Sequence, residues 1–173
     1  MLKIETLDWA DGNVPTPWHA ALDQIVAASF GGWSLADMPP AHRRCVVVSG
    51  ERILSHAAAQ RRTFALPTGE HTGYIIGCVC TAPEQRGRGM GTRATLELLQ
   101  NLRKDGAPFA VLNCGEERCG FYRRMGFRPL APRASYRRDG SIQIDEDPVM
   151  GMALGDFDLD VLKTDVFAVG DDF

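Results

Sequence analysis

Six stretches of the chain alternate apolar and polar residues or form short apolar runs of strand length. A period of two places apolar side chains on one face of a strand, and turn residues separate one strand from the next. The pattern therefore predicts strands over residues 2–7, 45–48, 52–64, 72–80, 109–114 and 149–154. Asp139-Gly140 lies between two further strand-like runs and predicts a hairpin.

Three other stretches carry apolar residues at helical spacing, which predicts helices over residues 17–30, 92–103 and 116–125. Each of these stretches is followed by glycine, the residue that most often ends a helix. The resulting order is β-α-β-β-β-α-β-α-β. It predicts an α/β (α+β mixed) fold, with helices on the faces of a mixed sheet, in a single domain over residues 1–173.

Composition and charge restrict the functional class. Acidic residues exceed basic ones by 22 to 19, and this formal net charge of −3 argues against non-specific nucleic-acid binding. Because there is no signal-peptide pattern and no apolar run of membrane-spanning length, we expect a cytoplasmic protein that does not bind membranes. The five cysteines form no zinc-ligand pattern, so we expect reduced thiols and no metal site.

The segment from Thr81 to Thr92, T-A-P-E-Q-R-G-R-G-M-G-T, carries the strongest chemical signal. It lies between a predicted strand and a predicted helix, where backbone N–H groups converge at the positive end of the helix dipole. Glycine leaves the backbone accessible and permits positive φ. Arg86 and Arg88 add charge that matches a pyrophosphate. The segment therefore predicts a phosphate-binding turn.

Three kinds of nucleotide-binding turn, and a plain surface turn, compete as interpretations. A dinucleotide-binding turn requires G-x-G-x-x-G and an acid at the end of the next strand, whereas Asp105 lies at the end of the predicted helix. A P-loop requires a lysine, and none follows Gly91. The remaining pattern is R/Q-x-x-G-x-G/A between strand and helix, preceded by Pro83. It resembles the coenzyme A pyrophosphate loop of the GNAT superfamily of acyl-CoA-dependent N-acetyltransferases.

A second motif, F-Y-R-R-M-G-F from Phe121 to Phe127, follows the next predicted strand. It resembles the GNAT helix whose tyrosine faces the CoA sulfur, although a core tyrosine is the plainer interpretation. Dispersed matches at residues 53–62, 73–74, 148–154 and 170–173 are similar to the aminoglycoside 2'-N-acetyltransferase family. The resemblance implies a GNAT-like mixed, mostly antiparallel sheet of six to seven strands with helices on both faces.

The resemblance also implies direct attack of an amine on acetyl-CoA in a ternary complex. Tyr122 is expected to protonate the CoA thiolate, and a backbone N–H near Cys78 to polarise the thioester carbonyl. Acetyl-CoA would be the co-substrate. The residues expected to bind it are Cys78, Val79, Cys80, Arg86, Gly87, Arg88, Gly89, Met90 and Gly91.

The general base departs from the family pattern. Members carry a glutamate on the strand before the turn, and the aligned residue here is Ile76, which cannot accept a proton. The remaining candidates are His56, Asp37, His71 on a predicted exposed turn, and the C-terminal carboxylate. A strand histidine is more often a packed core residue than a base. The base therefore stays open, as does an amine that arrives already deprotonated.

Acidic residues are expected to bind a cationic acceptor, because carboxylates form charge-assisted hydrogen bonds with ammonium groups. By resemblance, the substrate-binding residues are Asp37, Asn113, Asp145, Glu146, Asp147, Asp171 and Phe173 with its carboxylate. The plainer interpretation is a solvated acidic surface.

The expected function is 2'-N-acetylation of an aminoglycoside, which inactivates the antibiotic. Kasugamycin, which has a carboxylate of its own, would suit a site with isoleucine in place of glutamate. Two alternatives stay open: a GNAT enzyme for another small amine, a polyamine or a protein N-terminus, and an acyl-CoA-binding sensor with impaired catalysis. The resemblance is also compatible with a homodimer.

Overall fold

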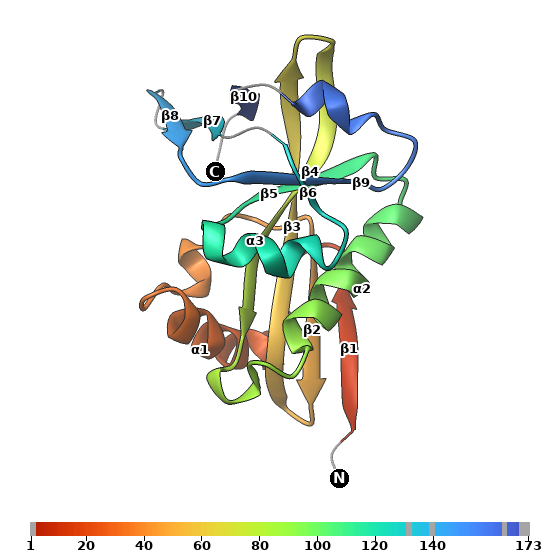
Figure 1. The fold of residues 1–173 in the computed structure, drawn as a ribbon. Coiled ribbons are helices and arrows are strands. Elements are labelled where there is room, and N and C mark those ends of the chain that lie inside the picture. Colours follow the sequence, from red (N-terminus) through yellow and green to blue (C-terminus); the bar gives the residue numbers. More distant parts are fainter. Residues whose placement is uncertain (1–2, 131–132, 139–140, 164–165, 170–173) are drawn as a thin grey trace. The chain divides into compact units, whose positions relative to one another are not determined.

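The computed structural model describes residues 3–130, 133–138, 141–163 and 166–169 (Figure 1). The chain divides into two compact units, one made of Met1–Gln60 and Ile76–Asn101 and the other of Arg61–Ile75 and Leu102–Phe173. Strands β3 and β4 each contribute a part to both units.

The helices of the described residues are α1 (His19–Ser29), α2 (Met90–Lys104) and α3 (Glu116–Arg123), with 3-10 helices η1 (Thr16–Trp18), η2 (Leu35–Asp37), η3 (Pro83–Gln85) and η4 (Leu159–Leu162). The strands are β1 (Ile4–Trp9), β2 (Arg43–Ser49), β3 (Arg52–Leu66), β4 (Gly69–Thr81), β5 (Phe109–Asn113), β6 (Arg128–Pro129), β7 (Arg133–Arg138), β8 (Ser141–Asp145), β9 (Val149–Ala153) and β10 (Val166–Val169). No helix in this described part is both long and apolar enough to cross a membrane.

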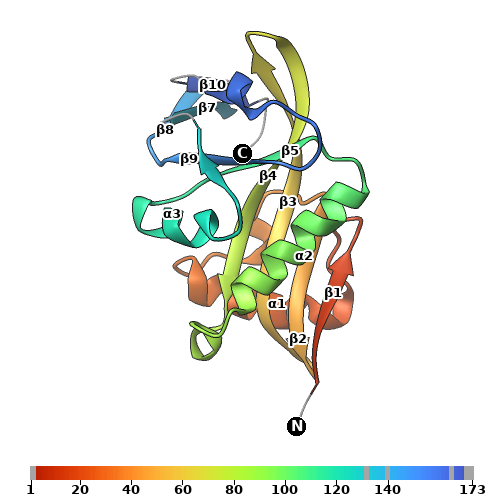
Figure 2. The same ribbon diagram turned by 45° about the vertical axis from the view of Figure 1, so that its right-hand side comes forward.

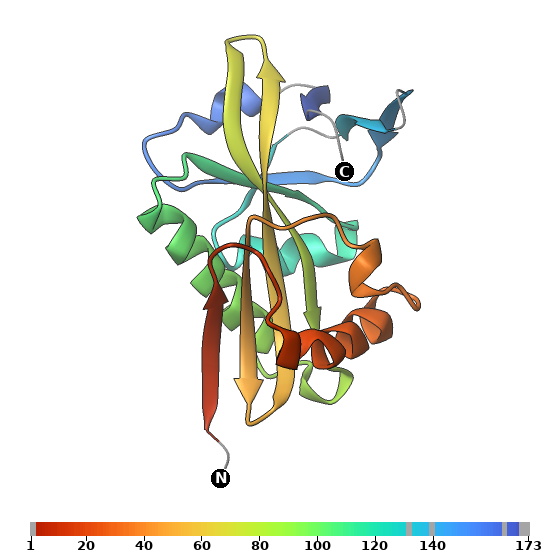
Figure 3. The same ribbon diagram turned by 180° about the vertical axis from the view of Figure 1, so that it is seen from behind.

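The first unit is built on an antiparallel sheet with a helix on each face. β1 pairs with β2, and β2 pairs with the first part of β3. α1 packs Leu22 and Val26 against Val46 of β2. The neighbouring Cys45 points to the opposite face, where its sulfur lies 3.9 Å from Asn101 Nδ2 of α2. Figures 2 and 3 show the two helices from opposite sides of the sheet.

The second unit contains two groups of paired strands. β5 pairs antiparallel with β9, which also pairs with β6, and β5 pairs in parallel with the part of β4 at Tyr74 and Ile75. The last part of β3 pairs antiparallel with β10. β10 pairs in parallel with β7, and β7 pairs antiparallel with β8. Phe64 and Phe109 meet edge to face at 5.2 Å between ring centroids and form part of a buried apolar cluster.

The predicted mixed α/β fold with a mostly antiparallel sheet is confirmed, and every predicted strand and helix is present. β7 and β8 form the predicted hairpin, whose turn at Asp139-Gly140 lies outside the described residues. The short strands β6 and β10 come in addition to the predicted ones. β2 begins at Arg43 and not at Cys45: the prediction followed the apolar run, whereas the strand also contains two arginines whose side chains are buried. The single domain over residues 1–173 stays a prediction.

Candidate active site

The glycine turn lies in the first unit, between η3 and α2. Gly87 and Gly89 have φ values of +74° and +77°, which L-residues with a side chain rarely adopt. No atom lies within 4 Å of a Cβ added at either residue, and the turn from Arg86 to Gly89 is exposed. Glycine is therefore required here for backbone conformation, and the space above the turn is open to a ligand.

The body of the unit fixes both ends of this turn. Before it, the N–H of Ala82 donates to the carbonyl of Leu54 at 2.9 Å. After it, the N–H of Arg93 donates to the carbonyl of Gly89 at 2.9 Å and begins the helical hydrogen-bond ladder. The N–H groups ahead of Arg93 have no carbonyl within the helix to bind. Together with the helix dipole and the exposed Arg86 and Arg88, they fit a pyrophosphate.

Cys78, on the strand that leads to this turn, has the one positive φ among the described non-glycine residues, +51°. The regular burial of β4 is interrupted here, where Gly77, Cys78 and Val79 are all half-buried. Burial raises the pKa of the Cys78 thiol above its usual value, so the thiol stays neutral. Any role of Cys78 in acetyl transfer therefore belongs to its backbone. That role stays a prediction.

His56 was a candidate base, and the structure contradicts this role. The imidazole is completely buried, with Nδ1 2.7 Å from the carbonyl oxygen of Cys78 and Nε2 3.2 Å from a terminal nitrogen of Arg44. Burial, and then the Arg44 guanidinium, lower the pKa of His56 to about 3. A base needs access to the proton it removes. Both nitrogens of His56 are engaged by protein groups.

The other candidate bases are tied to local structure. Asp37 is exposed and forms a capping box with Ser34 at the N-terminus of η2. Its carboxylate accepts from Ser34 N and Oγ at 2.7 Å, and these bonds lower the pKa of Asp37. His71 lies in β4, half-buried and 2.8 Å from Thr68 Oγ1, and not on the exposed turn that was predicted. Ile76 is buried in the first unit. The C-terminal carboxylate lies outside the described residues.

Tyr122, in the second unit, is a buried residue of α3. Its ring meets Phe121 and Phe127 edge to face, with centroids 4.9 Å and 5.8 Å away. Burial, followed by the nearby Cys114, raises the pKa of Tyr122 to about 12. The phenol therefore keeps its proton at every physiological pH, as a proton donor must.

The predicted acidic loop is also held within the second unit. Asn113 Nδ2 donates to the carboxylate of Asp145, which accepts the N–H of Asp147 at 2.9 Å as well. Glu146 forms a 3.7 Å ion pair with Arg133. Asp145 and Glu146 therefore already have protein partners, and Asp147 is exposed. Asp171 and Phe173 lie outside the described residues.

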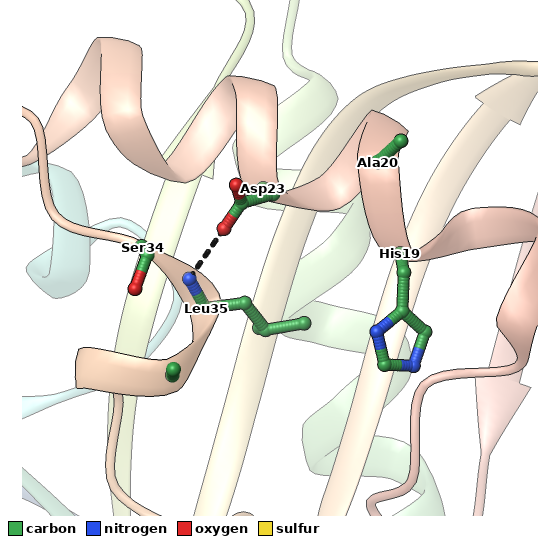
Figure 4. Close-up of a pocket in the computed structure, with 6 residues that line it drawn as sticks. His19, Ala20, Asp23, Ser34 and Leu35 are labelled. Atoms are coloured by element: carbon green, nitrogen blue, oxygen red, sulfur yellow. Dashed lines mark hydrogen bonds between the residues drawn. The ribbon is translucent and has the colours of Figure 1, made fainter.

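The first unit also contains an open cavity of about 630 Å³ beside α1 and η2. Its lining residues are His19, Ala20, Asp23, Ser34, Leu35 and Ala36. Figure 4 shows the Asp23 carboxylate between the two elements, where it accepts the N–H of Leu35 at 2.6 Å. Asp23 was not among the residues predicted from the sequence. The available signal was an acid one helical turn after His19, at the border of the apolar face of α1.

Among the described residues, no group of three or more His, Cys, Asp or Glu side chains could hold a metal ion. The family model described as Acetyltransferase (GNAT) domain matches residues 30–130, more than half of the chain. The chain belongs to the GNAT acetyltransferase family. It is therefore an acetyl-CoA-dependent N-acetyltransferase. No curated protein matches it at a significant level.

Solved structures share the fold. A GNAT family N-acetyltransferase from Escherichia coli, in complex with CoA, is 17% identical with a TM-score of 0.68, covering 99% of this chain and 91% of its own. A GNAT family acetyltransferase from Brucella melitensis, in complex with acetyl-CoA, is 22% identical with a TM-score of 0.57, covering 74% and 84%. A GCN5-related N-acetyltransferase from Kribbella flavida is 20% identical with a TM-score of 0.62; the match covers 76% of this chain but only 34% of that longer protein.

Proposed function

We propose that this N-acetyltransferase acts on an amino group of an aminoglycoside-like amino sugar. The observation that carries the proposal is the cavity beside α1 and η2, with the half-buried Asp23 carboxylate in its lining and Asp37 at the end of η2. A carboxylate in the lining of a small open cavity, with a second one nearby in the chain, suits an acceptor that carries an ammonium group. The dispersed matches to the aminoglycoside 2'-N-acetyltransferase family support the same acceptor.

The proposed chemistry is direct attack on the thioester. The glycine turn binds the pyrophosphate of acetyl-CoA, and a backbone N–H near Cys78 donates to the thioester oxygen. The amine lone pair forms the new C–N bond, and the C–S bond then breaks with its electrons on sulfur. Tyr122 supplies the proton that converts the thiolate to CoA thiol, and the proton lost by the amine returns to Tyr122 through water. The products are an acetamide and free CoA.

Ile76 narrows the acceptor further. A buried isoleucine cannot draw a proton from the amine, and the engaged His56 cannot replace it. We therefore propose that the amine arrives neutral. A site without the family's glutamate carries less negative charge and suits an acceptor of lower positive charge. Kasugamycin, an aminoglycoside that carries its own carboxylate, is the acceptor we favour.

The test is thiol release from acetyl-CoA with a panel of amines: kasugamycin, several deoxystreptamine aminoglycosides, spermidine and a peptide N-terminus. Turnover confined to aminoglycosides, with kasugamycin the best acceptor, is the expected result. Efficient acetylation of gentamicin- or kanamycin-type drugs without kasugamycin would overturn the kasugamycin assignment. Turnover with spermidine or the peptide alone would overturn the aminoglycoside assignment. Calorimetric binding of acetyl-CoA without any turnover would favour the sensor.

A further inference from the structure

Cys78 has a backbone conformation that is unfavourable for a residue with a side chain. Its φ of +51° lies in the left-handed region, which a residue with a Cβ occupies only when its surroundings enforce it. The residue lies within β4, where an extended conformation is the default. Something packed against Cys78 must therefore stabilise the unusual conformation.

Met38 Sδ lies 3.0 Å from the Cys78 thiol, and His56 of β3 contacts the peptide itself. Its Nδ1 lies 2.7 Å from the Cys78 carbonyl oxygen, which can only accept a hydrogen bond, so Nδ1 carries the proton. The unprotonated Nε2 then accepts from Arg44 at 3.2 Å. Arg44 is itself buried, and its Nε donates to the carbonyl of Gly12 at 2.8 Å. The four groups form a continuous hydrogen-bond chain inside the first unit, and the chain requires one tautomer of His56.

The direction of this hydrogen bond fixes the direction of the next amide. The Cys78 carbonyl and the Val79 N–H belong to one planar trans peptide, in which C=O and N–H point to opposite sides. When the carbonyl points to the buried imidazole, the Val79 N–H points away from it. The half-burial of residues 77–79 places this peptide at a partly open part of the strand.

We propose that His56, oriented by Arg44, is a positioning residue for acetyl transfer: it holds the Cys78 peptide so that the Val79 N–H donates to the thioester oxygen. This inference rests on the proposed donor chemistry and adds the identity of the amide and of the side chains that aim it. An aimed donor is effective because it needs no reorganisation when charge develops on the oxygen. His56 acts through the peptide and does not touch the substrate.

The test compares His56→Leu, which removes the hydrogen bond, with His56→Asn, whose amide N–H can replace Nδ1. Three quantities are measured: kcat, the Kd of acetyl-CoA, and the infrared carbonyl stretch of bound [1-13C]acetyl-CoA. We expect His56→Leu to lower kcat by roughly tenfold or more, a part of the effect of losing such a donor entirely. Its carbonyl band should move toward that of free acetyl-CoA, with Kd changed less than about twofold. His56→Asn should recover most of the rate and the band position.

Glycine adopts positive φ without strain, so Cys78→Gly serves as a second background if His56→Leu folds poorly. The double variant Cys78→Gly/His56→Leu should fold, and its carbonyl band should lie closer to the wild-type position than that of His56→Leu alone. An unchanged carbonyl band in His56→Leu would overturn the inference, as would an asparagine variant with the same losses as leucine. The band needs no acceptor amine. A wild-type enzyme without turnover would therefore count against the proposed function while the band still decides the role of His56.

Discussion

The glycine turn and the surroundings of Tyr122 are built in opposite ways. The turn is exposed, is made of backbone, and depends on two residues with positive φ, Gly87 and Gly89. Tyr122 is a buried side chain between two aromatic rings, and its pKa is raised by its surroundings. The first construction suits binding of a charged ligand from solvent. The second suits control of one proton.

This difference predicts that the two regions affect different constants. Changes in the turn should weaken acetyl-CoA binding and leave the saturated rate alone. Changes at Tyr122 should lower the rate and leave binding alone. The following predictions are ordered from the largest expected effect to the smallest.

Tyr122→Phe removes the proton donor and keeps the aromatic packing. Because a general acid contributes roughly 10²–10⁴-fold, kcat should fall by about a hundredfold or more. Steady-state thiol release measures the rate, and calorimetry measures the Kd of acetyl-CoA, which should be unchanged. Phe121→Tyr provides a control for ring packing at the neighbouring position. A Tyr122→Phe enzyme with normal kcat would remove Tyr122 from the chemistry.

The pH dependence should follow the acceptor and not the enzyme. His56, with its pKa lowered to about 3, and the buried Ile76 supply no base near neutral pH. The kcat/KM of the acceptor should therefore rise about tenfold per pH unit and level off at the pKa of the amine. That pKa is roughly 8 for an α-amine and 10.4 for an alkylamine. Tyr122, with its pKa raised to about 12, should cause no fall below pH 10. If the pH profile instead had the same midpoint on its acidic side for every acceptor, the enzyme itself would supply the base.

Gly89→Ala should weaken binding of acetyl-CoA, and Gly106→Ala is its matched control. Both glycines have φ of +77° and no atom within 4 Å of an added Cβ, so each substitution should cost about 1–2 kcal/mol of stability. Only Gly89→Ala should raise the Kd of acetyl-CoA, because the turn would move to relieve its strain and no longer fit the pyrophosphate. A binding loss of about 1.4 kcal/mol corresponds to a tenfold rise in Kd. Equal effects on Kd would show that general destabilisation, and not the turn, determines binding.

Asp23→Asn removes a charge from the cavity and keeps an oxygen that can accept the N–H of Leu35. The KM of a cationic acceptor should rise roughly threefold to fivefold, the size of a partly exposed ion pair. The KM of acetyl-CoA should not change. Asp158→Asn is the control, since Asp158 also accepts a backbone N–H, that of Asp160 at 2.9 Å, and does not line the cavity. An unchanged acceptor KM in Asp23→Asn would show that the cavity does not bind the acceptor.

The features predicted from sequence are those encoded by neighbouring residues. The strand, the glycines and the following helix lie next to one another in the chain, so the turn could be recognised from the order of residues alone. Residues that depend on distant partners were missed or misread. His56 stayed a candidate base because the partners that occupy it, Arg44 of β2 and the Cys78 carbonyl of β4, are distant in the sequence. Asp23 gained its place in the cavity only when η2 folded back on α1.

The most direct test of this division between binding and rate is a single-turnover measurement on the wild type, Gly89→Ala and Tyr122→Phe. The saturated acetyl-transfer rate and the Kd of acetyl-CoA are determined for each protein with the best acceptor. Gly89→Ala is predicted to raise Kd at an unchanged saturated rate, and Tyr122→Phe to lower the saturated rate at an unchanged Kd. A Tyr122→Phe protein that loses binding in proportion to its rate, or a Gly89→Ala protein slow at saturation, would contradict the account.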